Sequence, residues 1–195
     1  MASVIEAIRD ILRPGVFEEG KLVLQETAAG SRGSPITLNR RGKALMIRPD
    51  QVTVSGMSPV DRMFPLFDVQ KPGICQLCDY LVFFCPQPQT TSEVSDLFVF
   101  LFELKSGSAQ GSVRQLRNGK LLADYVLEVA HLHSHGVKRP AVHYRGITFV
   151  GDAPRSRIVA RYHKAFDWIE DGRLPTLRVC SCRPMLSHDL ETLCL

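Results

Sequence analysis

The sequence predicts one α/β domain in which helices flank a mixed β-sheet. Two apolar runs joined by a polar loop, residues 74–84 and 97–105, predict an antiparallel pair of strands. A segment over 112–134 has the period of an amphipathic helix, and 141–150 predicts one or two strands that include a central strand after this crossover helix. The chain has 195 residues and 45% hydrophobic content, which is enough to bury one full core.

A helix and several short strands are expected before the two long strands. Ser3 can cap a helix that runs to about Arg13, where Pro14 and Gly15 stop it. Turn-forming residues then separate four short strands, as in a meander. These strands are expected at 21–26, 36–39, 44–48 and 52–55.

The chain after residue 150 is expected to extend this core. Residues 162–168 predict a helix, and 174–182 predict a last strand. The predicted organisation is therefore a single domain with a core at about 74–150. Residues 1–73 supply the N-terminal helix and strands, and 151–195 form a C-terminal extension.

The strand over 97–105 ends in two charged residues, Glu103 and Lys105. Because side chains alternate along a strand, both share one face with Leu101, while Phe100 and Phe102 share the other. Charges at the rim of a buried strand cost desolvation free energy unless they have partners. A functional site therefore explains Glu103 and Lys105 better than an ordinary charged surface does.

The preceding strand brings a second carboxylate to this point. If Phe84 lies opposite Phe98, then counting back places Asp79 opposite Glu103. Two facing carboxylates repel each other, so the pair calls for a cation between them. Lys105 alone is a weak counter-ion for two carboxylates. Oxygen ligands suit a hard divalent ion such as Mg²⁺ or Mn²⁺, whose coordination would be completed by water and a phosphate oxygen.

These residues resemble the PD-(D/E)xK, or restriction-endonuclease-like, nuclease superfamily. The resemblance covers a fold core at roughly 74–150 and combines Asp79 with Glu103-Leu104-Lys105 on the next strand and Gln115 on the following helix. It implies that Asp79, Glu103 and the backbone carbonyl of Leu104 hold the metal. It also implies that Lys105 positions the attacking water and stabilises charge, with Gln115 as a further catalytic residue.

The sequence departs from the pattern of this family at two positions. Cys78 precedes Asp79, where the family often has Pro, and Gly119 stands where some members place Tyr in a Gln-x-x-x-Tyr arrangement. The family also often draws a further acid from its first helix. The candidates for that acid are Glu6, Glu18, Glu19 and Glu26.

The helix over 112–134 is expected to carry an apolar stripe on one side and basic residues near the charged strand tip. Arg114, Arg117 and Lys120 recur at spacings of three, where phosphate contacts would give sequence-independent affinity for nucleic acid. The net charge of +4 is only mildly basic, so this local cluster is a stronger indication of nucleic-acid binding than the net charge of the chain. The apolar stripe is expected to comprise Val113, Leu116, Ala123, Val126, Leu127 and Ala130.

The predicted function is thus Mg²⁺- or Mn²⁺-dependent hydrolysis of phosphodiester bonds, in DNA more than in RNA. The alternative is a catalytically inactive subunit on the same fold that binds nucleic acid or a partner protein. Association into a homodimer is compatible with either. No stretch reaches the 18 apolar residues of a membrane span, and the first 13 residues lack the pattern of a signal peptide, which predicts a cytoplasmic protein without a membrane segment.

Cysteine and histidine residues suggest a weaker, zinc-dependent alternative. Cys75, Cys78, Cys180 and Cys182 could form a zinc-dependent interaction domain, although Cys180-Ser-Cys182 lacks the usual two-residue gap. Reduced thiols packed in the core are the expected state of the cysteines in a cytoplasmic chain. Histidines at 131, 133 and 135 are expected to lie at the end of the long helix, where positive charge is favourable.

Overall fold

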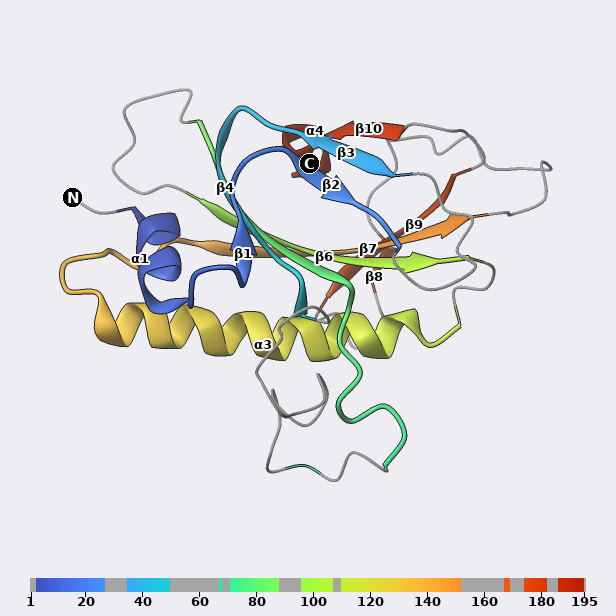
Figure 1. The fold of residues 1–195 in the computed structure, drawn as a ribbon, viewed down its shortest axis with the longest axis horizontal. Coiled ribbons are helices and arrows are strands. Elements are labelled where there is room, and N and C mark those ends of the chain that lie inside the picture. Colours follow the sequence, from blue (N-terminus) through green and yellow to red (C-terminus); the bar gives the residue numbers. More distant parts are fainter. Residues whose placement is uncertain are drawn as a thin grey trace.

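A computed structural model shows a mixed α/β fold with two sheets and helices on both sides of the larger one (Figure 1). The structure describes the following residues: 3–26, 35–49, 67, 71–87, 96–106, 110–151, 167–168, 174–181 and 186–194.

The larger sheet has seven strands in the order β1-β4-β5-β6-β7-β9-β8. Its middle strands, β4, β5 and β6, pair antiparallel, whereas β6, β7 and β9 pair parallel. Because β6 belongs to both halves, it is buried along nearly its whole length. The strands are β1 (Phe17–Glu18), β4 (Gly42–Ile47), β5 (Tyr80–Pro86), β6 (Leu97–Lys105), β7 (Val142–Gly151), β8 (Asp167–Trp168) and β9 (Pro175–Ser181).

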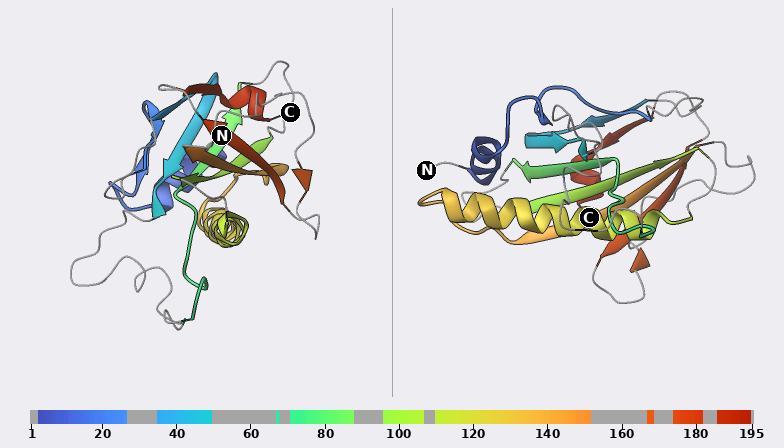
Figure 2. Two further views of the ribbon diagram at one scale, coloured as in Figure 1. Left: turned by 90° about the vertical axis from the view of Figure 1, so that its right-hand side faces the viewer. Right: turned by 60° about the horizontal axis from the view of Figure 1, so that its bottom comes forward.

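Helices α1 (Val4–Ile11) and α3 (Ser112–His133) cover one face of this sheet. Leu97, Val99 and Leu101 of β6 pack against them in one hydrophobic cluster. Figure 2 shows α3 running beneath the strands and α1 near one of its ends. The alternation predicted for β6 is therefore confirmed on this face.

A second layer covers the other face. It consists of a three-stranded sheet in the order β10-β3-β2 and the short helix α4. Phe100 and Phe102 of β6 pack into this layer with their rings stacked at 5.9 Å between centroids. The elements are β2 (Leu22–Leu24), β3 (Ile36–Asn39), β10 (Leu186–Asp189) and α4 (Leu190–Leu193).

The expected meander is wrong because its strands divide between the two sheets. Strand β2 pairs with β3, but β3 then pairs in parallel with β10 from the end of the chain, while β4 joins β5 in the larger sheet. The two layers are linked by Tyr80 at the start of β5. Its hydroxyl accepts from the amide of Gln25 and donates to the carbonyl of the same residue, each at 2.7 Å.

Helix α3 is the predicted crossover between β6 and the parallel strand β7. Its buried residues recur every three or four positions: Ser112, Leu116, Gly119, Ala123, Val126 and Ala130. Val113 was expected in this stripe but is 40% exposed. The reason is geometric, since Val113 is rotated by about 100° from the buried Ser112.

The remaining elements confirm the predictions in part. The first helix begins after Ser3, whose amide donates to Glu6 Oε2 at 2.7 Å in a capping box. The strand expected at 52–55 lies outside the described residues. The helix expected over 162–168 is contradicted at its end, because Asp167 and Trp168 pair with β9 as strand β8. Strand β9 is not the last element, since β10 and α4 follow it.

Candidate active site

The register of β5 and β6 brings the two predicted carboxylates to one end of the pair. Phe84 pairs with Phe98 and Tyr80 with Phe102, as predicted, so one further step places Asp79 opposite Glu103. Asp79 lies just before β5 and is anchored across to β6. Its Oδ2 accepts a 2.6 Å hydrogen bond from the amide of Leu104.

Glu103 is the most buried charged side chain of the site, at 1% exposure. Its Oε1 lies 2.5 Å from Lys105 Nζ, while its Oε2 is buried with no hydrogen-bond partner among the described residues. Burial, and then the nearby Asp79 carboxylate, raise the pKa of Glu103 to about 7, although Lys105 acts in the opposite direction. The carboxyl is therefore poised to change charge near neutral pH.

Lys105 connects this acid to helix α3. Its Nζ donates to Gln115 Oε1 at 2.8 Å, and Gln115 Nε2 in turn donates to the carbonyl of Leu77 at 3.2 Å. The ammonium is thus held between Glu103 and Gln115 instead of extending freely into solvent. The side chain of Lys105 is still 25% exposed, so solvent reaches the end of the strand.

Asn118, one turn after Gln115, is a site residue that the sequence did not reveal. Its amide nitrogen donates to the carbonyls of Gly73 and Gln76, each at 2.8 Å. These bonds hold the irregular segment that leads into Asp79. The sequence shows that a polar side chain lies one turn after Gln115. It does not show what Asn118 binds, because the segment that it contacts has no periodic pattern.

Gly119 explains one departure from the nuclease family. A Cβ atom at this position would lie 2.4 Å from the sulfur of Cys78, so a tyrosine cannot be accommodated in this packing. Cys78 is buried, and burial raises the pKa of its thiol well above the usual value. Cys78 therefore behaves as a small apolar residue beside Asp79, as expected for a core cysteine.

The donors at this strand end suit a hard divalent cation. The carboxylates of Asp79 and Glu103 and the backbone carbonyl of Leu104 offer only oxygen, which is the preference of Mg²⁺ and Mn²⁺. The buried Oε2 of Glu103 is an acceptor that such an ion would satisfy. Among the described residues no three His, Cys, Asp or Glu side chains cluster, so water and a phosphate would have to complete the coordination.

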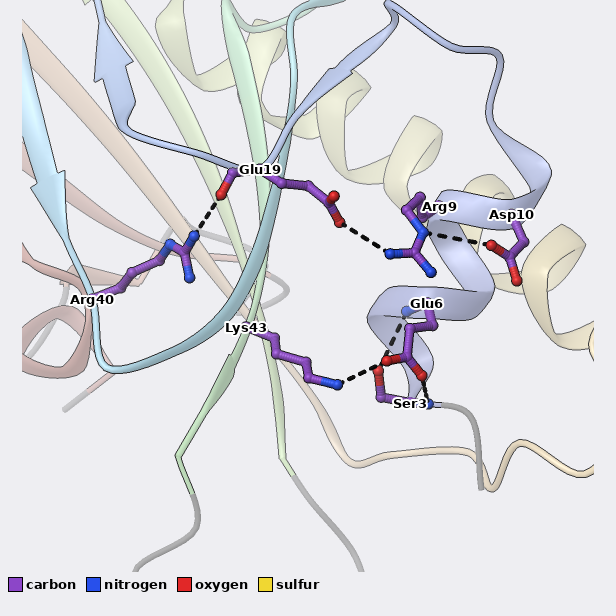
Figure 3. Close-up of polar contacts among 7 residues, drawn as sticks. All are labelled: Ser3, Glu6, Arg9, Asp10, Glu19, Arg40 and Lys43. Carbon is purple, nitrogen blue, oxygen red and sulfur yellow. Dashed lines mark hydrogen bonds and ion pairs between the residues drawn. The ribbon is translucent and has the colours of Figure 1, made fainter.

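Two candidates for a further acid are engaged elsewhere (Figure 3). Glu6 belongs to the α1 capping box and pairs with Lys43 Nζ at 2.8 Å, which helps lower the pKa of Glu6 to about 2. Lys43 pairs in register with Cys85, at the end of β5 remote from Asp79. Glu19 lies 4.0 Å from Arg9 of α1.

The other two candidates lie on an edge strand or on the face of the sheet opposite α3. Glu18 is on β1, the edge strand separated from β6 by β4 and β5. Glu26 follows Gln25, whose backbone binds Tyr80 on the face of the sheet opposite α3.

The predicted nucleic-acid-binding residues differ in their surroundings. Lys120 pairs with Asp124 Oδ2 at 2.7 Å and lies 4.2 Å from the centre of the Tyr144 ring. Arg114 and Arg117 are exposed on the half of α3 that carries Gln115, and the Arg114 guanidinium packs against Gly73. Arg114 and Arg117 are therefore more exposed on this half of the helix than Lys120, which is held in an ion pair.

The cysteines of the zinc alternative are only partly described. Cys75 is partly buried and free, and Cys78 donates its thiol to the carbonyl of Tyr80 at 3.5 Å. Cys180 is on β9, and Cys182 lies outside the described residues. His131 and His133 lie in the last turn of α3, and His135 lies beyond the end of the helix.

The chain matches no protein-family model, no curated protein and no solved structure. Any functional proposal must therefore depend on the geometry around Asp79 and Glu103. Within the part of the chain that the structure describes, no helix is long and apolar enough to cross a membrane.

Proposed function

We propose that the protein is a metal-dependent nuclease that hydrolyses phosphodiester bonds, in DNA more than in RNA, with Mg²⁺ or Mn²⁺. The observation that carries the proposal is the state of Glu103. Its carboxyl is buried opposite Asp79, with one oxygen unpartnered and the other against Lys105. Such an arrangement costs stability in the resting protein, and a cation-binding role accounts for that cost.

Each residue of the site has a definite part in this proposal. Asp79, Glu103 and the carbonyl of Leu104 would hold the metal, which when bound supplies a Lewis acid and lowers the pKa of water. Lys105 positions the attacking water and stabilises the negative charge that grows on the phosphate. Gln115 holds Lys105 in place through its 2.8 Å hydrogen bond.

The preference for a polymeric substrate follows from the helix beside the site. Arg114 and Arg117 present positive charge on the same half of α3 as Gln115, and in this proposal they contact phosphates of the polymer away from the scissile bond. Contacts of this kind give affinity without reading sequence. The choice of DNA over RNA depends on the family resemblance and must be decided by assay.

A second candidate is a catalytically inactive subunit that binds nucleic acid or a partner protein on the same fold. One observation favours it, because no third acid joins Asp79 and Glu103 among the described residues. A site with two carboxylates can retain its fold after losing the ability to activate water.

A cleavage assay separates the two candidates. The purified chain is incubated with supercoiled DNA, linear DNA and RNA in Mg²⁺, in Mn²⁺ and in EDTA. The nuclease proposal predicts metal-dependent cleavage that Lys105→Ala reduces by at least about 100-fold. Lys21→Ala is the matched control, since Lys21 is exposed and lies immediately before β2 of the second layer.

Each outcome of this assay is decisive. Cleavage by the parent and by Lys21→Ala, but not by Lys105→Ala, supports the nuclease. If the parent binds nucleic acid without cutting it, then the inactive-subunit alternative replaces the proposal. If Lys105→Ala cuts as well as the parent, then the cleavage does not depend on this site and the proposed mechanism is wrong.

A further inference from the structure

Arg48, immediately after β4, is a half-buried cation whose donors have no acceptor among the described residues. Its Nε is buried without a hydrogen-bond partner, and its two terminal nitrogens donate to no group of the described chain. Arg40 and Arg145 are half-buried as well, but each of them donates to backbone carbonyls. Because a guanidinium keeps its charge and its five donors, Arg48 is suited to an anion that the described chain does not supply.

The ring of Tyr80 holds this guanidinium in place. The central carbon of the Arg48 guanidinium lies 5.0 Å from the centre of the ring, within the range of a cation–π contact. The ring is itself fixed, since the Tyr80 hydroxyl bonds to the amide and to the carbonyl of Gln25, each at 2.7 Å. The donors of a guanidinium lie in its plane, so an aromatic contact on its face orients them and leaves them available.

Arg48 lies at the edge of the sheet that carries the two carboxylates of the candidate site. The β4–β5 ladder, extended by one residue, puts Arg48 opposite Tyr80, which pairs with Phe102 of β6. Glu103 follows Phe102, and since neighbouring strands are about 4.8 Å apart, the backbones of Arg48 and Glu103 are about 10 Å apart. The two side chains lie on opposite faces, with Arg48 beside Tyr80 on the second-layer face and Glu103 on the α3 face.

We propose that Arg48 is a phosphate-binding residue that contacts a nucleic-acid strand beyond the scissile bond. The inference rests on the proposed function, which makes the substrate a polymer of phosphodiesters. A strand that contacts α3 on one face and Arg48 on the other passes over the ends of β5 and β6, where Asp79 and Glu103 lie. The two terminal nitrogens of Arg48 then donate side by side to two oxygens of one phosphate, a geometry that matches the guanidinium fork.

A phosphate of a polymer fits Arg48 better than free inorganic phosphate does. One guanidinium supplies a single positive charge, which is a weak site for a free anion in salt solution. A polymer that is held by other cations of the protein instead presents its phosphates to Arg48 at a high effective concentration. Each such contact also releases condensed counterions from the nucleic acid, which adds to the affinity.

The dependence of DNA binding on salt tests the proposal, by fluorescence anisotropy of a labelled duplex at several KCl concentrations. The measurement is made in EDTA, so that it requires no cleavage. Arg48→Met should weaken binding by about 10-fold at low salt and reduce the slope of log K against log salt by about 0.9, the value for one phosphate contact. Arg48→Lys should restore the slope and only part of the affinity, because it keeps the charge without the fork.

A control and a stability measurement separate binding from a structural role. Arg41→Met removes an exposed charge at the other end of β4 and should leave the slope and the affinity unchanged. Arg48→Met removes a buried, unpartnered donor together with a cation–π contact, and because these effects oppose each other, its unfolding midpoint should stay within about 3 °C of the parent. If Arg48→Met does not fold, Arg48→Gln repeats the salt titration.

Titration with inorganic phosphate, followed by calorimetry, distinguishes the two sources of phosphate. The polymer proposal predicts no saturable binding of the free anion at low millimolar concentration. A parent that binds no DNA, an unchanged salt slope in the folded Arg48 variants, or saturable phosphate binding that Arg48→Met removes while DNA binding stays the same would overturn the proposal.

The cleavage assay gives an independent result. DNA that binds through Arg48 without being cut removes the nuclease proposal and leaves this one, whereas cleavage with an unchanged salt slope does the reverse.

Discussion

The amide of Leu104 donates to Asp79 Oδ2 at 2.6 Å, which ties the tip of β6 to the residue that precedes β5. The bond fixes the position of Asp79 beyond the last pair of the β5–β6 ladder, where regular pairing no longer holds it. Glu103 is the neighbour of Leu104 on the same strand. The two carboxylates are therefore positioned by one short stretch of backbone, and a change in this stretch should disturb both.

Glu103→Gln should alter the dependence of stability on pH. The pKa of Glu103 is raised from 4.5 to about 7, so between these two pH values the native state holds a proton that the unfolded state has released. Stability from this group is present at low pH and is lost as pH rises through 7. In EDTA, the parent should lose about 1–3 kcal/mol more than Glu103→Gln over this range.

Chemical denaturation at several pH values measures this difference. Glu6 does not interfere, because its pKa is lowered to about 2 and its contribution changes only in more acidic solution. Equal pH slopes for the parent and Glu103→Gln would show that the buried carboxyl is not strained in the native state.

Gln115→Ala should reduce cleavage less than Lys105→Ala does. Gln115 touches Lys105 and the Leu77 carbonyl, so it acts by positioning the ammonium. Loss of such a supporting bond costs about 10-fold to 100-fold in rate. Steady-state kinetics should show a fall in kcat with little change in KM, and Gln115→Glu, which retains an acceptor, should recover part of the rate.

The contrast between two further variants is also informative. If Gln115→Ala impairs metal binding as strongly as Glu103→Gln does, then Gln115 belongs to the metal site and is not a positioning residue. Metal-binding calorimetry on both variants distinguishes these outcomes.

Gly119→Ala should destabilise the protein in a way that depends on Cys78. The added Cβ would lie 2.4 Å from the Cys78 sulfur, and overpacking of this kind costs about 1–3 kcal/mol. In a Cys78→Ala background the clash is removed, so Gly119→Ala should become neutral or stabilising by up to about 1 kcal/mol through helix propensity.

Thermal unfolding of the four proteins in this cycle gives the coupling free energy between positions 78 and 119. Gly20→Ala is a control, since no atom lies within 4 Å of a Cβ placed there. Additive effects of the Cys78 and Gly119 substitutions would contradict the close contact.

Tyr80→Phe should weaken the connection between the two layers. The substitution removes two hydrogen bonds of 2.7 Å between the Tyr80 hydroxyl and the backbone of Gln25. We expect a loss of about 1–2 kcal/mol in the free energy of unfolding, measured by denaturant titration. Hydrogen exchange of β2 amides should accelerate in the variant, and unchanged exchange there would contradict a role for Tyr80 in holding the second layer.

The pairing of β5 with β6 was predictable because both runs are apolar along their length and one register opposes their aromatic residues. Once Phe84 is set opposite Phe98, alternation alone places Asp79, Glu103 and Lys105 at one end. Helix α3 was predictable for a similar reason, since its buried residues recur with the helical period. These are local patterns, and they determine where the site residues lie in the fold.

The contacts that support the site were not predictable in the same way. Asn118 and Gln115 bind backbone carbonyls of an irregular segment, which no side-chain period describes. The pairing of β3 with β10 joins residues from opposite ends of the chain, and tertiary context decides such a choice. A close contact such as that of Gly119 with Cys78 depends on how α3 seats on the sheet, which becomes visible only in three dimensions.

Anomalous diffraction from crystals soaked in Mn²⁺ above pH 7, where Glu103 is ionised, tests whether a metal binds between Asp79 and Glu103. We expect a Mn²⁺ peak within about 2.5 Å of carboxylate oxygens from both Asp79 and Glu103. An absence of density at this strand end, or a peak bound elsewhere while the Glu103 carboxyl remains buried against Lys105, would contradict this expectation.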